Sequence, residues 1–195
     1  YTISDFLAWL AKYGLAYRQK VVNENLKNAF PEKTPMEKAR ISTKFYAHFY
    51  DLLFESIRMF SMSGQEAQKR FRVKNPELVN ELFDSGKSLI LTGGHYQNWE
   101  LFAVATAPQI NHTLLGIYTP LSSAFMERQF ARTRTQLGLV LVPKKKTADY
   151  FDQFKDTATI TTFAIDQSPR KDQKAYWTSF LGLPTATHYG AELYA

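Results

Sequence analysis

His95 and Glu100 stand directly after a glycine pair, with four residues between them. The apolar run over residues 88–92 precedes the glycines and predicts a buried strand. In α/β proteins, chemistry is concentrated where a strand ends in a turn. A histidine can accept a proton at neutral pH, and a carboxylate can fix its tautomer and stabilise the imidazolium. The pattern predicts a general base with an acidic partner, and the alternative is a histidine that only caps the following helix.

The spacing limits how His95 and Glu100 can meet. On one continuous helix, five residues correspond to about 500°, which puts the side chains roughly 140° apart around the axis. We therefore expect His95 on the turn ahead of the helix, with its side chain folded back toward Glu100. Gly93 and Gly94 permit such a turn because glycine tolerates positive φ. No metal site is predicted, since the sequence lacks the histidine pair at i and i+4 that zinc helices use.

Further polar residues can bind or position a substrate. Arg128 and Arg132 lie four residues apart on a predicted helix and share one face, with Arg134 close by. Guanidinium groups bind phosphate or carboxylate through paired hydrogen bonds, although a solvated basic face is the alternative. Asp166 follows the apolar run 159–165 and so marks a second strand end, where its alternative role is a turn or helix cap.

The first third of the chain predicts helices. Apolar residues recur at helical spacing over residues 3–13, which indicates either a core helix or the end of a membrane-lying helix. Thr34-Pro35-Met36-Glu37 is a capping box, and the apolar stripe behind it predicts one long helix from Pro35 to about Phe60. A second capping box at 63–66 predicts a short helix.

The remainder alternates between strand-like and helical segments. The strand-like runs are 88–92, 113–118, 139–142 and 159–165, and the helical segments between them are 98–107, 123–137 and 147–155. This alternation predicts an α/β fold with a central, mostly parallel or mixed sheet flanked by helices. We expect an N-terminal helical portion over 1–72, packed on an α/β core over 73–195. Residues 189–195 predict the opening of another helix, so we expect the core to be C-terminally incomplete.

Composition narrows the class of protein. There is no cysteine, which excludes disulfides, thiolate metal sites and a covalent cysteine intermediate. The net charge of +6 suits acidic carriers, anionic membranes or nucleic acid, but no nucleic-acid motif accompanies it. No apolar run is long enough for a transmembrane helix. Because the first residue is not Met, we expect a preceding segment that can hold an anchor.

One late segment combines turn residues with aromatic side chains. Gly182 and Pro184 predict a shaped loop over residues 179–187. Trp177 and Phe180 add an apolar surface that can contact an acyl chain or a membrane.

In this order, the motifs resemble the lipid A biosynthesis lauroyl/myristoyl acyltransferases, within the lysophospholipid acyltransferase-like superfamily. The resemblance runs from about Tyr17 to Ala195 and is carried by an ordered set of blocks. These are Tyr17–Val22 with Asn25-Leu26 and Ala29-Phe30-Pro31; Thr92–His95 through Trp99-Glu100; Tyr118–Leu121 with Arg132 and Gly138; Asp166-Gln167; and Phe180–Pro184 with Thr187. Thr119 departs from the family, which often has arginine there, so an anionic contact is absent at that position.

The resemblance implies a fold like that of the glycerol-phosphate acyltransferases and an enzyme without cofactor. It implies transfer of a fatty acyl group from acyl carrier protein or acyl-CoA to a hydroxyl of a membrane lipid, a lipid A precursor. His95 would be the general base and Glu100 its orienting partner. Arg132 and Arg128 would contact anionic substrate, and Asp166 would support the site. The implied location is the cytoplasmic face of the inner membrane, peripheral or anchored by a segment outside this chain.

Other functions stay open at this point. A lysophospholipid or an amino-lipid can replace the lipid A precursor as acceptor. A membrane-surface module that binds lipid without catalysis accounts for the aromatic content and the positive charge. A third alternative is a hydrolase that transfers the acyl group to water.

Overall fold

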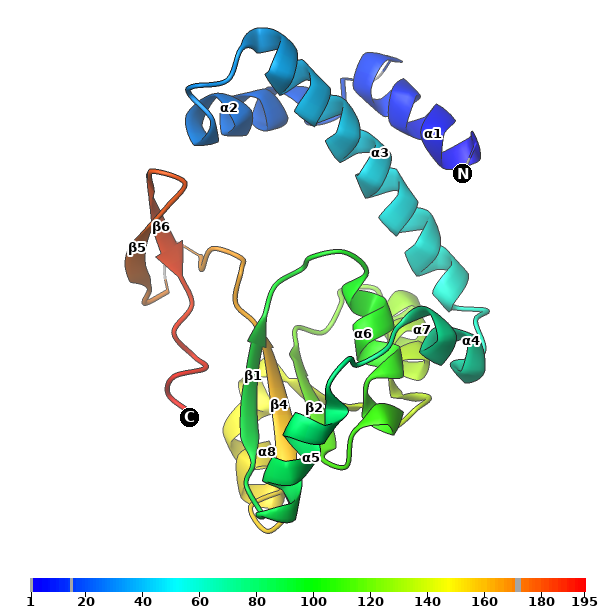
Figure 1. Ribbon diagram of the computed structural model, residues 1–195, viewed down its shortest axis with the longest axis vertical. Coiled ribbons are helices and arrows are strands. Elements are labelled where there is room, and N and C mark those ends of the chain that lie inside the picture. Colours follow the sequence, from blue (N-terminus) through cyan, green and yellow to red (C-terminus); the bar gives the residue numbers. More distant parts are fainter. Residues whose placement is uncertain (1, 15, 171–172) are drawn as a thin grey trace. The chain divides into compact units, whose positions relative to one another are not determined.

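The computed structural model describes residues 2–14, 16–170 and 173–195. The chain divides into two units, each with its own internal packing: Tyr1–Ile57 with Tyr176–Ala186, and Arg58–Ala175 with Thr187–Ala195. Figure 1 shows the first as blue and cyan helices with an orange-red hairpin, and the second as the sheet with its helices. The predicted division at residue 72 stays a prediction.

The first unit is helical, with one hairpin. Its elements are α1 (Thr2–Trp9), the π-helical segment Leu10–Gly14, α2 (Gln19–Ala29), most of α3 (Pro35–Met59) and the strands β5 (Tyr176–Phe180) and β6 (Leu183–Thr187). The long helix α3 confirms the predicted span. Its capping box is reciprocal, because the Thr34 N–H donates to Glu37 Oε2 at 2.8 Å and the Glu37 N–H donates to Thr34 Oγ1 at 3.3 Å.

Helix α1 packs on α3 through its small and polar residues. Ala8 lies in a buried cluster with Tyr46, and Ser4 Oγ donates to Asp51 Oδ1 at 2.6 Å. Large apolar side chains take the outward positions of the same helical segment, with Phe6 and Trp9 both more than half exposed. This polarity is the reverse of that of an ordinary surface helix.

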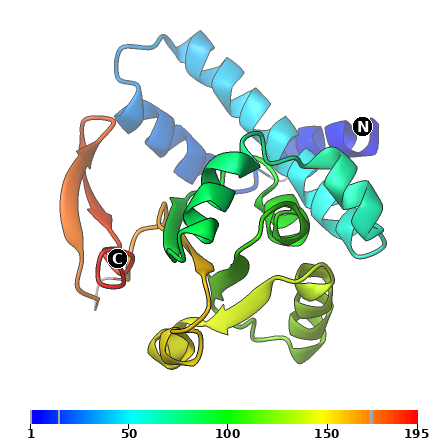
Figure 2. The same cartoon turned by 60° about the horizontal axis from the view of Figure 1, so that its bottom comes forward.

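The second unit is an α/β layer structure. Its four strands β1 (Leu89–Gly93), β2 (Thr113–Tyr118), β3 (Val140–Pro143) and β4 (Thr159–Ala164) form one sheet of order β1-β4-β2-β3, and every neighbouring pair is parallel. The helices are α4 (Gly64–Arg70), α5 (Pro76–Asp84), α6 (Trp99–Ala105), α7 (Ala124–Thr135) and α8 (Thr147–Gln153), with short 3-10 turns at Ala107–Gln109 and Lys144–Lys146. The predicted fold class is confirmed. Figures 1 and 2 show α5 and α6 on one side of the sheet and α8 on the other.

Successive residues along the strands supply the two sides of the sheet. Leu89, Ile160 and Leu114 are register partners on adjacent strands, and they form a core cluster with residues of α5 and α6. The next row, Ile90, Thr161 and Leu115, points to the opposite side by the period of two. The central strands β2 and β4 contain most of the buried residues of the sheet, as their apolar runs predict. Strand β1 lies at the sheet edge and is exposed from Leu91 on, so the prediction of a buried strand there is wrong.

Two local predictions need correction. Residues 189–195 form turns rather than the opening of a helix, with the Tyr194 N–H bonded to the Ala191 carbonyl at 3.2 Å. The Tyr194 ring stacks on Phe151 at 4.7 Å, a tertiary contact that holds the segment in this shape. The predicted loop at 179–187 is instead most of a two-stranded hairpin, whose turn residues were recognised but whose strands were not.

Candidate active site

Parallel pairing brings His95 and Asp166 to the same edge of the sheet. Gly93 and Ala164, the last residues of β1 and β4, are register partners. His95 and Asp166 each follow these ends by two residues, so they occupy equivalent positions beyond adjacent strands. The carboxyl edge of a parallel sheet is where α/β proteins bind ligands.

Both carboxylate oxygens of Asp166 accept hydrogen bonds from His95. The imidazole Nδ1 lies 2.7 Å from Oδ1, and the backbone N–H of His95 donates to Oδ2 at 2.7 Å. The side chain of His95 is 30% exposed, so a substrate can reach it. The Trp99 ring meets the imidazole edge-to-face at a centroid distance of 4.9 Å and restricts its rotation.

These bonds set the charge of Asp166 and the tautomer of His95. Partial burial acts to raise the pKa of Asp166, but the bonds from the ring and backbone of His95 outweigh it, and the pKa is lowered. The carboxylate is therefore ionised at neutral pH and accepts a hydrogen bond from Nδ1–H. The neutral ring then has its lone pair on Nε2, the arrangement of a general base.

The glycine pair was expected to supply positive φ, but neither Gly93 nor Gly94 adopts it, and the pair acts instead through the space it leaves at one position. A Cβ built on Gly94 would lie 3.2 Å from the carboxyl carbon of Asp166, whereas a Cβ on Gly93 would meet nothing within 4 Å. The absent side chain at Gly94 thus lets Asp166 approach His95. Gln97, further along the turn, has a positive φ of 55°, a conformation that non-glycine residues seldom adopt.

The predicted pairing of His95 with Glu100 does not form. Glu100 is buried and instead binds Arg134 of α7, with Arg134 Nε and Nη2 donating to its two oxygens at 2.8 and 2.5 Å. Burial acts to lower the pKa of Arg134, but the bond to Glu100 outweighs it and the pKa is raised. His95 lies on the turn, as predicted, but Glu100 on α6 faces the helix packed beside it. The carboxylate that meets the ring is Asp166.

A third carboxylate, that of Glu127, shapes the loop after β2. Glu127 of α7 accepts hydrogen bonds from the Tyr118 hydroxyl and the Leu121 N–H, both at 2.8 Å. These two bonds hold the pKa of Glu127 below its usual value. Burial, with the bond to Glu127, raises the pKa of Tyr118 to about 12. The sequence analysis missed Glu127 and the partnership of Arg134, because both depend on how α7 packs.

Arg128 and Arg132 lie on α7 and are both exposed. Among the described residues, neither has an ion-pair partner. Their guanidinium groups are therefore available to anionic ligands, but no contact joins them to His95 or Asp166. Over the residues that the structure describes, no three or more metal-ligating side chains form a cluster that could hold an ion.

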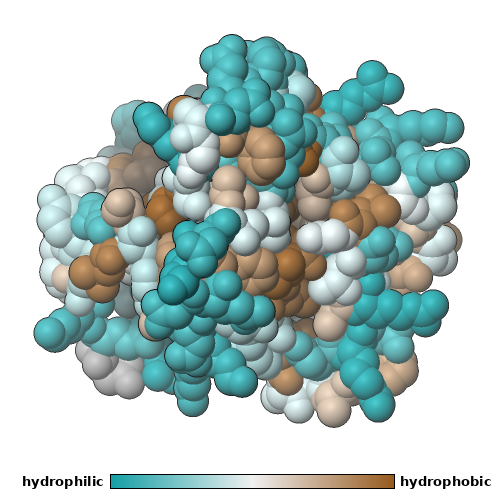
Figure 3. Space-filling model, turned by 90° about the horizontal axis from the view of Figure 1, so that it is seen from below, coloured by the Kyte–Doolittle hydropathy of each residue, from teal (hydrophilic) through white to brown (hydrophobic). Residues whose placement is uncertain are grey.

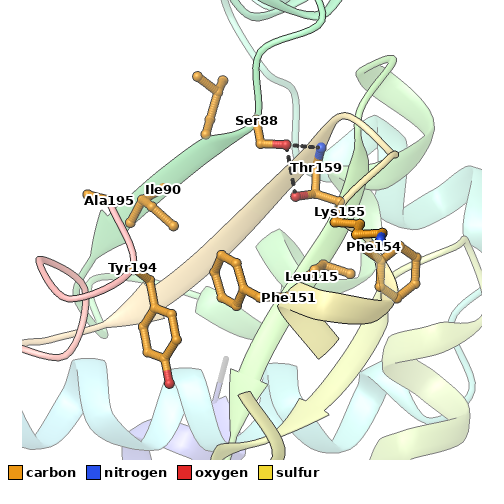
Figure 4. A pocket seen from close by; sticks show the side chains of 10 residues that line it. Ser88, Ile90, Leu115, Phe151, Phe154, Lys155, Thr159, Tyr194 and Ala195 are labelled. Atoms are coloured by element: carbon orange, nitrogen blue, oxygen red, sulfur yellow. Dashed lines mark hydrogen bonds between the residues drawn. The ribbon is translucent and has the colours of Figure 1, made fainter. Parts of the chain in front are cut away.

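A pocket of about 550 Å³ lies away from these residues. It is lined by Ile90, Leu115 and Phe151, with Tyr194 beside Phe151 (Figure 4). Ser88 at its rim comes just before β1, whereas His95 follows the opposite end of that strand. The pocket is thus a mostly apolar hollow on the α8 side of the sheet, separate from the His95–Asp166 pair.

An accessible imidazole on a carboxylate, at the carboxyl edge of a parallel sheet, is typical of α/β enzymes that use a general base. Comparison with protein families identifies which of these enzymes the chain is related to. It belongs to the bacterial lipid A biosynthesis acyltransferases, whose family model matches residues 1–195. Comparison with curated proteins finds no match. The resemblance inferred from the motifs is confirmed.

Family membership makes the protein an acyltransferase that takes an acyl donor and a lipid acceptor. It also indicates a membrane-associated location. Among the described residues, no helix is both long enough and apolar enough to cross a membrane. Viewed from below, the surface is largely hydrophilic with separate apolar patches (Figure 3).

Proposed function

We propose that this enzyme transfers a fatty acyl group from an acyl thioester to a hydroxyl of a lipid A precursor, with His95 as general base. The observation that carries the proposal is the pair of hydrogen bonds that the ring and the backbone N–H of His95 donate to the Asp166 carboxylate. It fixes the position of the imidazole and leaves Nε2 with a lone pair. An alcohol is a poor nucleophile, so a positioned base that takes its proton accelerates attack typically 10²–10⁴-fold.

In the proposed reaction, the acceptor hydroxyl attacks the thioester carbonyl while its proton passes to His95 Nε2. Collapse of the tetrahedral intermediate breaks the carbon–sulfur bond, and the imidazolium returns the proton to the thiolate. The products are the ester and the free thiol of the carrier. Asp166 stabilises the imidazolium between these steps. No protein nucleophile is needed, because the thioester is already activated.

The tetrahedral oxyanion needs hydrogen-bond donors. Backbone N–H groups of residues 94–97 are candidates, but two of them are engaged, since His95 donates to Asp166 and Tyr96 donates to the Gly94 carbonyl at 2.8 Å. The remaining candidates on this turn are the N–H groups of Gly94 and Gln97. Arg132 and Arg128 are proposed to bind anionic groups of the substrates. Glu100 is proposed to act through Arg134, by holding α6 and therefore the end of the turn in place.

The net charge of +6 supports an acidic acyl carrier protein as donor, with acyl-CoA as a second anionic donor, and an anionic membrane surface as the place of reaction. We place the reaction at the cytoplasmic face of the inner membrane, where such donors are found.

The test is an acyl-transfer assay with a lipid A precursor, comparing acyl carrier protein and acyl-CoA as donors. The expected result is acceptor-dependent thiol release and an acylated lipid, both abolished in His95→Ala. His48→Ala is the matched control, because His48 is exposed in the helical unit and should leave the rate unchanged. Equal thiol release with and without acceptor would identify a hydrolase instead. An active, folded His95→Ala protein would contradict the proposal.

A further inference from the structure

The hairpin β5–β6 exposes an unusual set of side chains. Trp177 and Phe180 are 66% and 63% exposed, and Leu181 at the tip is 48% exposed. No charged residue occurs from Tyr176 to Thr187, although 22% of the chain is charged. An isolated two-stranded hairpin is marginally stable in water, and uncharged exposed strand edges favour aggregation. The composition therefore indicates a surface that is covered when the protein works.

The turn adds an independent observation. Leu181 and Gly182 both have positive φ, of 50° and 74°, as in a two-residue type I′ hairpin turn. Asn or Gly is preferred at the first of these positions, and leucine there is under backbone strain. The chain thus carries a large apolar side chain at the outermost point of the hairpin, where folding alone favours a polar one.

The charge around the hairpin identifies its partner. The sequence before β5 holds Arg170, Lys171 and Lys174 against one acidic residue, Asp172, and Lys174 is exposed. Aromatic side chains next to basic residues are the composition of segments that bind the interface of anionic bilayers.

We propose that the β5–β6 hairpin docks the protein on an anionic lipid surface, with Trp177, Phe180 and Leu181 in the interfacial layer. This inference rests on the proposed lipid acceptor and names the element that meets the membrane. Tyr176 follows Asp166 by ten positions, so the chain keeps the start of the hairpin within about 35 Å of Asp166. The length of this tether limits how far the candidate active site can lie from a membrane-embedded acceptor.

Vesicle co-sedimentation tests the docking without any turnover. Wild-type protein should bind vesicles that contain phosphatidylglycerol more tightly than vesicles of phosphatidylcholine alone. Trp177→Ser and Phe180→Ser should each weaken binding roughly tenfold, because burial of an aromatic side chain is worth about one decade of affinity or more. Lys174→Gln should weaken binding to the anionic vesicles about fivefold. Phe125→Ser is the matched control, since Phe125 is 62% exposed on α7.

Leu181→Asn separates a folding role from a docking role. Asparagine suits the turn, so the variant should unfold at the same or a higher temperature and yet bind vesicles less tightly. A protein whose only tryptophan is Trp177, made by Trp9→Phe and Trp99→Phe, should show a blue-shifted emission that brominated lipids quench.

Unchanged vesicle binding in the hairpin variants overturns the proposal, as does unshifted Trp177 emission in vesicle-bound protein. Loss of binding in Phe6→Ser alone would assign docking to α1 instead. Self-association in the absence of lipid that the hairpin variants abolish would assign the surface to a second copy. His95→Ala should bind vesicles normally, so a failure of docking and a failure of the acyltransferase mechanism are distinguishable.

Discussion

Asp166 and His95 are 71 positions apart in the chain, yet both carboxylate oxygens of Asp166 bind His95, one at the ring and one at the backbone. The parallel pairing of β1 with β4 brings them together, because each residue follows its strand end by the same interval. A substitution at either strand end should therefore alter the position or the hydrogen bonding of the His95 imidazole.

Asp166→Asn should lower kcat on the order of 10²–10⁴-fold with little effect on KM. The amide cannot stabilise the imidazolium as a carboxylate does, and it can bind the wrong tautomer of the ring. The measurement is steady-state acyl transfer, with Asp156→Asn as the matched control because Asp156 is exposed on the surface. An unimpaired Asp166→Asn enzyme would remove Asp166 from the mechanism.

Gly94→Ala should impair the enzyme much more than Gly93→Ala. The new methyl group at residue 94 would lie 3.2 Å from the Asp166 carboxyl group, so the carboxylate that binds His95 must shift to make room, whereas residue 93 has open space. We expect at least a roughly tenfold loss of kcat for Gly94→Ala, because misplaced catalytic groups are costly. Nuclear magnetic resonance of the His95 ring should show a changed Nδ1 environment in that variant alone. Equal rates for the two variants would argue against the close approach.

Breaking the Glu100–Arg134 pair should destabilise the protein rather than remove catalysis outright. Glu100 and Arg134 side chains are 8% and 21% exposed, and removing one member of a buried pair typically costs about 3–5 kcal/mol. Denaturant unfolding of Glu100→Gln should show a loss of this order. Replacing both residues by leucine should recover much of it.

The exposed pair Arg58–Glu66 provides the comparison. Arg58→Ala should change the free energy of unfolding by about 0–1 kcal/mol, as surface pairs do. If Glu100→Gln lost activity at full stability, a direct role for Glu100 in the reaction would follow.

The sequence predicts the strands and most of the helices because their signals are local. The capping box at Thr34, the N-cap at Ser63 and the apolar strands appear where the sequence predicts them. The His95–Glu100 pairing failed because it assumed that neighbours in sequence are neighbours in space. Strand order decides the actual partner, and the motif near His95 does not contain that information.

The strands of the hairpin and the contact of Arg134 with Glu100 could not be predicted from the sequence, because local patterns do not specify either of them. The segment 176–187 has a strand pattern that Gly182 and Pro184 interrupt, and these turn residues predict a loop more strongly than the short flanking runs predict strands. Arg134 belongs to the basic cluster of Arg128, Arg132 and Arg134, and no sequence pattern distinguishes it from the other two. Helix packing distinguishes them, since Arg134 turns toward α6 whereas Arg128 and Arg132 remain exposed.

The stabilisation that Asp166 provides should disappear in acid. The folded protein lowers the pKa of Asp166 below its ordinary value of 3.8, so folding favours the ionised form. A depressed pKa contributes stability that is present above the unfolded value and is lost as the pH falls through the folded value. The free energy of unfolding of the wild type should therefore exceed that of Asp166→Asn above about pH 4, which is close to the pKa of aspartate in the unfolded chain. The difference should shrink as the pH falls further.

Denaturant titrations of the two proteins in a series of acidic buffers measure this difference directly. Asp156→Asn serves again as control, and its difference from the wild type should stay flat over the same buffers. The difference in unfolding free energy between the wild type and Asp166→Asn could instead persist below the lowered pKa. That result would show that the uncharged side chain of Asp166 stabilises the fold through packing or hydrogen bonds. In that case the ionised carboxylate would not be what holds the imidazole in the folded protein, and the assignment of the proton to Nδ1 would lose its basis.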